Sequence, residues 1–388
     1  MPKKVRLALV GCGRRGVYVT SLFKAHPLCA VTALMDRFIA KAQGAARELD
    51  LPDARIFDEF DTFLRDAPAD AVFFACDPTE QAALACQAME SGRHVCTEVP
   101  AAFTIEDCWL LVNAVARSGC KYQLMEQTRH WGFIETWRQM HQRGEFGHLC
   151  FAQGEYIHYE RRWNYWMDSE TGEFYFDPVP PPGRPVVPTW RGSMLADPIY
   201  YLPHTLSPLL SILQDRVVRV SCMGTRKNSY TYPEGTLAWS DIQYALMHTA
   251  KDTVLAVGAS FSLPYVRRGP TGCHWYELRG TKASVESPRC ASDSFRLWRV
   301  GAESYEAMDL STTPLTATAE EASTGHGGAD FRPVDGFVRC IVENTTPPLD
   351  VLHAAEITAP AVLAAESARL GGTVLSVPDF RRNHPAPC

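Results

Sequence analysis

Three glycines near the start of the chain, in the pattern Gly-x-Gly-x-x-Gly, constrain its fold more than any other feature. An apolar, β-rich run at residues 5–10 leads into Gly11, Gly13 and Gly16, and a helical pattern follows. In a strand–turn–helix unit of this kind, the first glycine permits the tight turn and the second lets a ligand approach the backbone. The third permits close packing of helix and strand. The start of that helix offers free N–H groups and a favourable dipole to a pyrophosphate.

A second expected strand, "AVTALMD", ends in Asp36, twenty residues past Gly16. A carboxylate there can accept both hydroxyls of an adenosine ribose and repels a 2′-phosphate, which favours NAD over NADP. Arg37 next to it can accommodate a 2′-phosphate, so NADP stays open. We therefore predict an NAD site in this region, formed by Gly11, Gly13, Arg14, Arg15, Gly16, Asp36 and Arg37.

Strands and helices keep alternating as far as about residue 125, with strand-like runs in "DAVFFACDP" and "HVCTEV". That alternation predicts a parallel, doubly wound sheet. Beyond Gly144 the strand-like stretches follow one another and predict a largely antiparallel sheet. We predict an α/β protein with an NAD-binding Rossmann domain at residues 1–125 and a second α/β domain, for substrate binding and oligomerisation, at residues 126–388.

The charge and composition exclude several classes of protein. A net charge of -6 argues against nucleic acid as the main partner. No run of 18 apolar residues predicts a membrane span, and the N-terminal "MPKKVRLALVGCG" lacks the apolar core of a signal peptide. The 13 cysteines form no CxxC pair and are interpreted as buried thiols in a reducing cytoplasm. No cluster with metal-ligand spacing is present, so we expect no metal.

The strand at residues 94–99 ends in Glu98-Val99-Pro100. Ligands of doubly wound sheets bind beyond the carboxyl ends of the strands, so we assign Glu98 and Pro100 to the cofactor site. A Rossmann domain with Glu-x-Pro at this place resembles the Gfo/Idh/MocA oxidoreductases, most of which have Glu-Lys-Pro. Members of that family pair the Rossmann domain with an α/β domain on a large open sheet, and most act on sugars or cyclitols. Val99 stands where the lysine would be, and it cannot stabilise an alkoxide.

A narrower resemblance explains the valine. The segment "EVPAAFTIEDCWLLV" is similar to the Glu-Val-Pro segment of the NAD-dependent glycoside hydrolases of the α-N-acetylgalactosaminidase type. Three further segments, "LMEQTRHW", "GEYIHYERR" and "YYLPHTLSPLL", resemble active-site segments of the same group. The residues after the glutamate and the stretch before the histidine motif differ from that group. By this resemblance the catalytic residues are Glu126, Tyr156, Tyr201 and His204.

The resemblance also implies a reaction. A pyranoside is oxidised transiently at C3, with hydride passing to NAD, so that the C2 proton becomes acidic and the C1 substituent is eliminated. Water then adds, and the stored hydride restores the alcohol. Histidine side chains have an unperturbed pKa near 6.5, which suits proton exchange at neutral pH, so His204 is our candidate for the base. Tyr156 or Glu126 would accept the second proton, the former only if neighbours depress its pKa, and Tyr201 would hold a ring.

Two other functions stay open at this point. One is a net dehydrogenase or ketoreductase of a sugar, glycoside or cyclitol, and the other is a non-catalytic NAD-binding regulator. His130, His158 and His274 are weaker site candidates, because only their spacing near aromatic residues commends them.

Two segments are expected to lie outside regular structure. Residues 161–192 are dense in Trp, Tyr, Phe and Pro with little periodicity, and we predict a long ordered loop that binds a sugar or seals a subunit interface. Residues 311–330 predict a surface loop or mobile flap. An open sheet with one uncovered face also predicts a homodimer or homotetramer.

Overall fold

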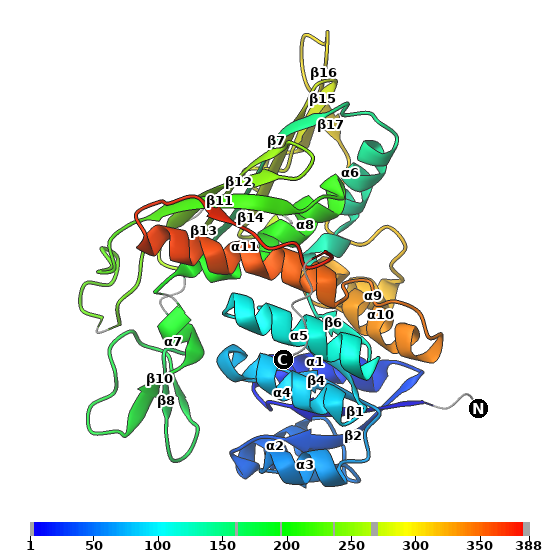
Figure 1. Cartoon of the computed structure of the whole chain (residues 1–388), viewed down its shortest axis with the longest axis vertical. Coiled ribbons are helices and arrows are strands. Elements are labelled where there is room, and N and C mark those ends of the chain that lie inside the picture. The colour runs from blue at the N-terminus through cyan, green and yellow to red at the C-terminus, as the bar shows by residue number, and fades with distance from the viewer. Residues whose placement is uncertain (1–3, 160–161, 195, 236, 265–270, 383–388) are drawn as a thin grey trace. The chain divides into compact units, whose positions relative to one another are not determined.

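The computed structural model describes residues 4–159, 162–194, 196–235, 237–264 and 271–382. Its contacts divide the chain into two compact units (Figure 1). Unit 1 consists of Met1–Glu126, Asp330–Glu356 and Phe380–Cys388. Unit 2 consists of Gln127–Ala329 and Ile357–Asp379. The chain therefore leaves the first unit after the N-terminal third and returns to it near the C-terminus.

Unit 1 is built on a six-stranded, wholly parallel sheet in the order β3-β2-β1-β4-β5-β6. The strands are β1 Val5–Val10, β2 Cys29–Met35, β3 Arg55–Phe57, β4 Ala71–Phe74, β5 His94–Thr97 and β6 Tyr122–Leu124. The helices are α1 Arg14–Ala25, α2 Ile39–Glu48, α3 Phe60–Asp66, α4 Pro78–Glu90, α5 Ile105–Ser118 and α10 Phe331–Val342. The order reverses between β1 and β4, which creates the crevice in which such sheets bind ligands. The predicted doubly wound sheet is confirmed.

Helix α10 completes the core of unit 1 although it lies more than 200 residues beyond β6 in the sequence. Its Val334, Phe337 and Val338 are fully buried in the same apolar cluster as the strands and α1. The ring of Phe337 meets Phe23 edge to face, with centroids 6.3 Å apart. Burying such side chains stabilises the fold by roughly 1.5–3 kcal/mol each.

Unit 2 is built on a nine-stranded sheet in the order β17-β16-β15-β14-β7-β13-β12-β11-β18. Only the β7–β13 pair is parallel among the pairings in this sheet, so the expected mainly antiparallel sheet is confirmed. The strands are β7 Leu149–Ile157, β11 Val217–Gly224, β12 Gln243–Thr249, β13 Val254–Ser260, β14 His274–Gly280, β15 Ala283–Glu286, β16 Phe295–Arg299, β17 Glu306–Met308 and β18 Leu375–Ser376.

Helices of unit 2 cover one face of this sheet. They include η1 Thr128–His130, α6 Gly132–Gln142, η2 Pro198–Tyr201, α8 Pro203–Leu213 and the second part of α11 Val351–Arg369. Figure 1 shows α8 and α11 running along the sheet, and the Ser367 hydroxyl of α11 accepts a hydrogen bond from the Cys222 amide of β11 at 2.9 Å. Strand residues alternate between this face and the opposite one, so Cys222 and Ala245 are buried while Met223 and Leu246 point outward.

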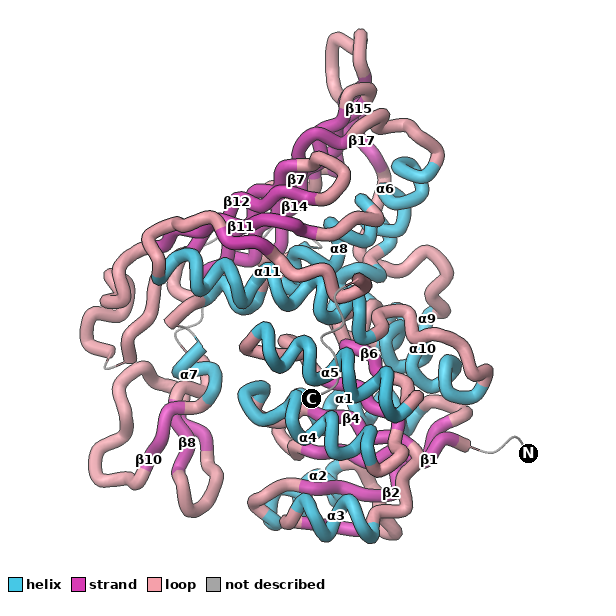
Figure 2. The backbone as a smooth tube through the Cα atoms, in the orientation of Figure 1, coloured by secondary structure: helices cyan, strands magenta, loops and turns pink. Residues whose placement is uncertain are grey.

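The two segments expected to be irregular contain short regular elements. The region from Trp163 onward forms a separate three-stranded sheet in the order β10-β8-β9, followed by α7 Trp190–Met194, with long loops between (Figure 2). Its strands are β8 Trp166–Asp168, β9 Phe174–Tyr175 and β10 Val186–Pro188. The prediction of a loop without strands was wrong here, because pairings of two or three residues leave no periodicity in the sequence. Residues 160–161 lie outside the described residues.

The segment after residue 311 contains α9 Ala319–Ala322, which begins with a capping box between Thr318 and Glu321, and η4 His326–Gly328. The backbone amide of Phe133 in α6 donates a hydrogen bond to the Ser311 carbonyl at 2.9 Å. A Cβ added to Gly132 would lie 2.3 Å from the Thr313 carbonyl oxygen, so glycine is required at the start of α6. The expected loop is therefore partly helical, and its first residues pack closely on α6.

Three absences hold for the described ranges. No helix there has both the length and the apolar character that crossing a bilayer requires. No group of three or more His, Cys, Asp or Glu side chains in them is arranged to hold a metal ion. The cysteines in those ranges are all free thiols, and most are buried.

Candidate functional site

The glycine turn of unit 1 has the geometry that a dinucleotide site requires. Gly11 has a φ of +94°, and a Cβ there would lie 2.5 Å from the Ala75 carbonyl oxygen. A Cβ on Gly16 would lie 2.2 Å from the Gly11 carbonyl oxygen. Both positions therefore admit only glycine. Around Gly13, by contrast, a Cβ would meet nothing within 4 Å, so open space borders the turn where a pyrophosphate would approach.

Helix α1 starts at Arg14 directly after this turn. Gly13 is its N-cap, makes no side-chain capping bond, and no acidic residue occupies the first turn. The first N–H groups of the helix are thus not capped by a side chain, which suits an anionic ligand. Arg14 is exposed at this end of the helix. These residues fit the pyrophosphate of NAD.

Asp36 follows β2 and braces the same turn. Its Oδ2 accepts a hydrogen bond from the Cys12 amide at 2.9 Å, and its Oδ1 accepts one from the Phe38 amide at 3.0 Å. Two lone pairs of a carboxylate are thereby used, and two remain for ribose hydroxyls. Arg37 is exposed, with its guanidinium 5.5 Å from the centroid of the Phe38 ring.

Arg15 joins three distant parts of unit 1. Its Nε donates to Glu98 Oε1 at 2.8 Å, and its terminal nitrogens lie 3.3 and 3.4 Å from the two carboxylate oxygens of Asp330. Burial lowers the pKa of Arg15, but the two carboxylates outweigh it and raise the pKa overall, so the guanidinium stays charged. No sequence pattern pointed to Asp330, because 315 residues separate it from Arg15.

The Glu98-Val99-Pro100 turn is held from helix α4. The side-chain amide of Gln81 donates to the carbonyl oxygens of both Glu98 and Pro100, at 2.9 and 3.0 Å. The Val99–Pro100 peptide is cis, and Val99 is 7% exposed. The valine side chain therefore packs inside unit 1, and this turn supplies a carboxylate and no amine.

Glu126 ends unit 1, two residues beyond β6 at the carboxyl end of the parallel sheet, and is fully buried. The other three residues of the predicted catalytic set belong to unit 2.

Tyr156, Tyr201 and His204 come together in unit 2 although three different elements carry them. Tyr156 lies near the end of β7, Tyr201 ends η2, and His204 lies in the first turn of α8. Their ring centroids form a triangle with sides of 5.8, 5.4 and 6.0 Å. We call these three residues the tyrosine–histidine triangle. The structure thus groups three residues that only the family resemblance had linked.

The backbone at His204 is fixed by an unusual pair of hydrogen bonds. In a helix the His204 carbonyl would accept from the residue four positions on, but that residue is Pro208, which has no N–H. The carbonyl instead accepts from the Tyr276 phenol at 3.1 Å and from the Thr128 hydroxyl at 2.9 Å.

His274 adjoins the triangle and is neutral. Its ring centroid is 4.6 Å from that of Tyr156. Burial, reinforced by the neighbouring imidazoles of His204, His158 and His326, holds the pKa of His274 well below its usual range. Its Nδ1 lies 3.1 Å from the Tyr276 phenol oxygen. Since that phenol donates its proton to the His204 carbonyl, Nδ1 of His274 carries the hydrogen and donates to the phenol.

The surroundings of Tyr156 bear on its proposed role as second proton acceptor. Burial, together with the nearby Cys273 and Tyr201 side chains, raises the pKa of Tyr156 well above its usual value, and Arg191 offsets this only in part. A depressed pKa, which Tyr156 would need in order to accept the second proton, is therefore not produced by its surroundings. Tyr156 is a neutral phenol at neutral pH and is suited to donating a hydrogen bond rather than accepting a proton.

Aromatic side chains from the region after residue 161 line one side of the triangle. Trp163 and Trp190 each have their ring centroid 6.2 Å from that of Tyr201. The guanidinium of Arg191 lies 4.6 and 4.8 Å from the same two tryptophan rings. His158, a weaker candidate from the sequence, also belongs here, with its ring 4.6 Å from Tyr156. His130 lies in η1 instead.

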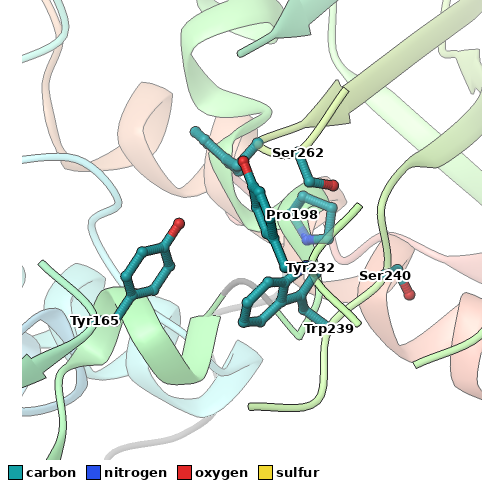
Figure 3. Close-up of a pocket in the computed structure, with 7 residues that line it drawn as sticks. Tyr165, Pro198, Tyr232, Trp239, Ser240 and Ser262 are labelled. Atoms are coloured by element: carbon teal, nitrogen blue, oxygen red, sulfur yellow. The ribbon is translucent and has the colours of Figure 1, made fainter. Parts of the chain in front are cut away.

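A separate hollow adjoins this group at Phe261, whose ring centroid is 4.5 Å from that of Tyr201. It is lined by Tyr165, Pro198, Tyr232, Trp239, Ser240, Phe261 and Ser262. Figure 3 shows the rings of Tyr232 and Trp239 beside Pro198, and the centroids of Tyr165 and Trp239 are 5.8 Å apart in a stacked arrangement. The hollow contains none of the predicted catalytic residues, so we interpret it as packing that supports η2.

Two family models match this chain, one near its N-terminus and one over its C-terminal part. Residues 5–126 match the NAD-binding Rossmann fold of the Gfo/Idh/MocA oxidoreductase family, and residues 237–385 match the C-terminal domain of glycosyl hydrolase family 109. A glycosyl hydrolase family 109 protein from Phocaeicola vulgatus is 25% identical over 98% of this chain and 95% of its own length. An α-N-acetylgalactosaminidase from Bacteroides fragilis is 32% identical over 44% of this chain and 41% of its own length.

Solved structures share the fold. An oxidoreductase from Agrobacterium radiobacter in complex with NAD⁺, L-tartaric acid and magnesium has a TM-score of 0.73 at 16% identity, over 96% of this chain and 98% of that one. The WlbA dehydrogenase from Bordetella pertussis, in complex with NADH and UDP-GlcNAcA, has a TM-score of 0.70 at 17% identity, over 97% and 99%. The predicted resemblance and fold class are confirmed. The chain therefore combines an NAD-binding Rossmann domain of the Gfo/Idh/MocA oxidoreductase family, over residues 5–126, with the C-terminal domain of glycosyl hydrolase family 109, over residues 237–385.

Proposed function

We propose that this protein is an NAD-dependent enzyme that cleaves glycosides by transiently oxidising the C3 hydroxyl of a pyranoside. The observation that carries the proposal is the tyrosine–histidine triangle, which gathers Tyr156, Tyr201 and His204 in a chain that also has a glycine turn fitted to NAD. The names of the relatives, glycosyl hydrolase family 109 and α-N-acetylgalactosaminidase, support the same reaction class.

Each member of the triangle has a proposed task. His204 takes the proton of the C3 hydroxyl, since a neutral imidazole is a suitable base near pH 7. Tyr156, held as a phenol by burial, donates a hydrogen bond to a sugar oxygen. Tyr201 and the neighbouring Trp163 and Trp190 offer ring faces to the C–H patches of the sugar.

The glycine turn, Asp36 and the Glu98-Pro100 turn would hold NAD, with Arg14, Arg15 and Arg37 beside them. When bound, NAD supplies a hydride acceptor that returns the hydride at the end of the cycle. Removal of the C2 proton needs a further base. We assign this to Glu126, because a carboxylate can act as a general base and the raised pKa of Tyr156 removes the phenol as an alternative.

Incubation of the protein with p-nitrophenyl glycosides in deuterated water tests this function. We expect release of p-nitrophenol, a free sugar that carries deuterium at C2, and no accumulation of NADH. NADH formed in proportion to a stable ketosugar would instead identify a net dehydrogenase. Bound NAD with neither product would identify a non-catalytic NAD-binding protein. His204→Gln should abolish turnover and the exposed His148→Gln should not.

We also propose a homo-oligomer formed through the outer face of the nine-stranded sheet. Met223, Leu246 and Val254 lie on this face and are 67%, 59% and 40% exposed, which is costly for a monomer in water. Leu246→Asp should shift the sedimentation coefficient to that of a monomer. Leu315, which is 52% exposed, provides the control, since Leu315→Asp should leave assembly unchanged.

A small-molecule substrate and a cytoplasmic location complete the proposal. The net charge of -6 disfavours nucleic acid, and the free thiols of the described residues suit a reducing compartment. Cell fractionation with an antibody against the native protein tests the location.

A further inference from the structure

The segment just before Tyr201 determines where two members of the triangle lie. Residues 196–200 form a turn and most of η2, so no strand ladder fixes them. Tyr201 follows directly, and His204 follows three residues later in the first turn of α8. Whatever holds this segment therefore also sets the direction of Tyr201 and His204.

Asp197 is the centre of that attachment. It is 4% exposed, and three partners from separate elements of unit 2 donate to its carboxylate. Gln243 of β12 donates to Oδ1 at 2.6 Å, Arg369 of α11 donates to Oδ2 at 3.0 Å, and the Lys227 ammonium also contacts Oδ1. Charge-assisted bonds of this kind are stronger than bonds between neutral groups.

The same three partners also hold neighbours of Asp197. Lys227 donates to the Ala196 carbonyl. The Ile199 amide donates to the side-chain oxygen of Gln243 at 3.2 Å. Arg369 hydrogen-bonds the Tyr200 side chain. Each partner thus hydrogen-bonds two residues of the segment. We call Asp197 and its three partners the brace of residues 196–200.

The burial of the partners shows which member the brace depends on. The side chains of Lys227 and Arg369 are 41% and 48% exposed, whereas that of Asp197 is 6% exposed. Water can hydrate the two cations if the carboxylate is lost, but nothing else in the brace can replace the carboxylate at its centre. Loss of Asp197 would therefore loosen the segment, which would keep only its bonds to neighbouring residues such as Ala196 and Ile199, while the sheet and α11 stay in place.

We propose that Asp197 is a positioning residue: through Lys227, Gln243 and Arg369 it fixes residues 196–200 and thereby sets the geometry of Tyr201 and His204. The inference rests on the proposed function, because it concerns the side chains to which that function assigns binding and proton transfer. Asp197 itself acts only through this segment and touches no reacting atom.

Four variants of the whole protein, loaded with NAD, test the proposal. Asp197→Asn keeps the size of the side chain and removes its charge. Gln243→Leu removes both bonds of the amide, and Arg369→Ala is compared with Arg369→Lys, which retains the cation. We expect kcat to fall about 10- to 100-fold in the first three with KM changed less, because small misplacements of reacting groups have effects of this size. Arg369→Lys should recover part of the loss. Arg143→Ala, which breaks the surface pair with Glu145, is the matched control.

Hydrogen–deuterium exchange tests the positioning role of Asp197 independently of whether the protein cleaves glycosides. Amides of residues 196–204 should exchange at least tenfold faster in Asp197→Asn and Gln243→Leu, while amides of unit 1 and the affinity for NAD stay unchanged. Unaltered exchange in this segment overturns the positioning role even if glycosides are cleaved. Faster exchange in a protein that cleaves no glycoside leaves the brace intact and overturns the proposed function. If Asp197→Asn does not fold, Gln243→Leu and Arg369→Ala give the same readouts.

Discussion

The Tyr276 phenol donates a hydrogen bond of 3.1 Å to the backbone carbonyl of His204. That carbonyl is open to a tyrosine from β14 because Pro208, one turn later in α8, has no N–H to offer it. A proline within a buried helix and a phenol on the sheet thus act together on the candidate base.

This relationship predicts the behaviour of Tyr276→Phe. Without the phenol, the His204 carbonyl loses one donor and keeps the Thr128 hydroxyl, and Nδ1 of His274 loses the phenol as its acceptor. We expect kcat to fall about tenfold, as for the loss of one hydrogen bond at a buried site, with KM little changed. The double variant with Thr128→Val should lose more than either single variant. Tyr305→Phe, at a tyrosine that is 49% exposed, should retain full activity in the same p-nitrophenol assay.

In the glycine turn, we expect a change from glycine to alanine to have different effects at positions 16 and 13. Gly16→Ala places a Cβ 2.2 Å from the Gly11 carbonyl oxygen, so we expect a loss of several kcal/mol in the free energy of unfolding. Gly13→Ala meets nothing within 4 Å and should leave the unfolding free energy within about 1 kcal/mol of the parent. It should nevertheless weaken NAD binding at least tenfold, because the methyl group occupies the approach of the pyrophosphate. Urea unfolding and calorimetric titration distinguish these results, and equal stability of the two variants would contradict the packing argument.

The charge of Asp36 should determine the relative affinity of the protein for NAD and NADP. Asp36→Asn retains an oxygen that can accept from the Cys12 amide but removes the charge that repels a 2′-phosphate. We expect the ratio of the dissociation constants for NADP and NAD to fall about tenfold. Asp53→Asn, at an exposed position, should not alter that ratio. An unchanged ratio in Asp36→Asn would assign the discrimination to another residue.

His274 predicts a pH dependence of stability. Its pKa is lowered in the folded protein, so below about pH 6.5 the unfolded chain binds a proton that the folded chain does not. The free energy of unfolding should therefore decrease as the pH falls below about 6.5, by at most about 1.4 kcal/mol per pH unit from this group. His274→Gln removes the group, so urea unfolding between pH 7.5 and 5.5 should show a shallower decline. His148→Gln, an exposed histidine, should follow the parent, and a parental slope in His274→Gln would contradict the prediction.

The sequence predicted the parts of the molecule that local patterns encode. The glycine spacing and the acid after the second strand predicted the parallel sheet and its cofactor turn, because these depend on neighbours within about thirty residues. Local capping follows the same rule, since the Thr104 hydroxyl at the start of α5 accepts from the Asp107 amide three residues on, at 3.0 Å. The tyrosine–histidine triangle required the family resemblance, because three elements far apart in the sequence contribute to it.

Other features had no local signal. Asp330 pairs with Arg15 across 315 residues, and Asp197 pairs with Arg369 across 172. The short strands β8, β9 and β10 were missed because each has only two or three residues. The direction of the Tyr156 pKa shift depends on burial against Cys273 and Tyr201, which no spacing in the sequence reveals.

The return of Asp330–Glu356 to unit 1 has a consequence for biosynthesis. During translation, the N-terminal third of the chain emerges first, and Phe23 and its neighbours lack their contacts with α10 until α10 leaves the ribosome about 200 residues later. We therefore expect the nascent chain to expose an aggregation-prone apolar patch during most of its synthesis. A fragment that stops at residue 126 should accordingly be insoluble, and it should recover when α10 is co-expressed as a separate polypeptide.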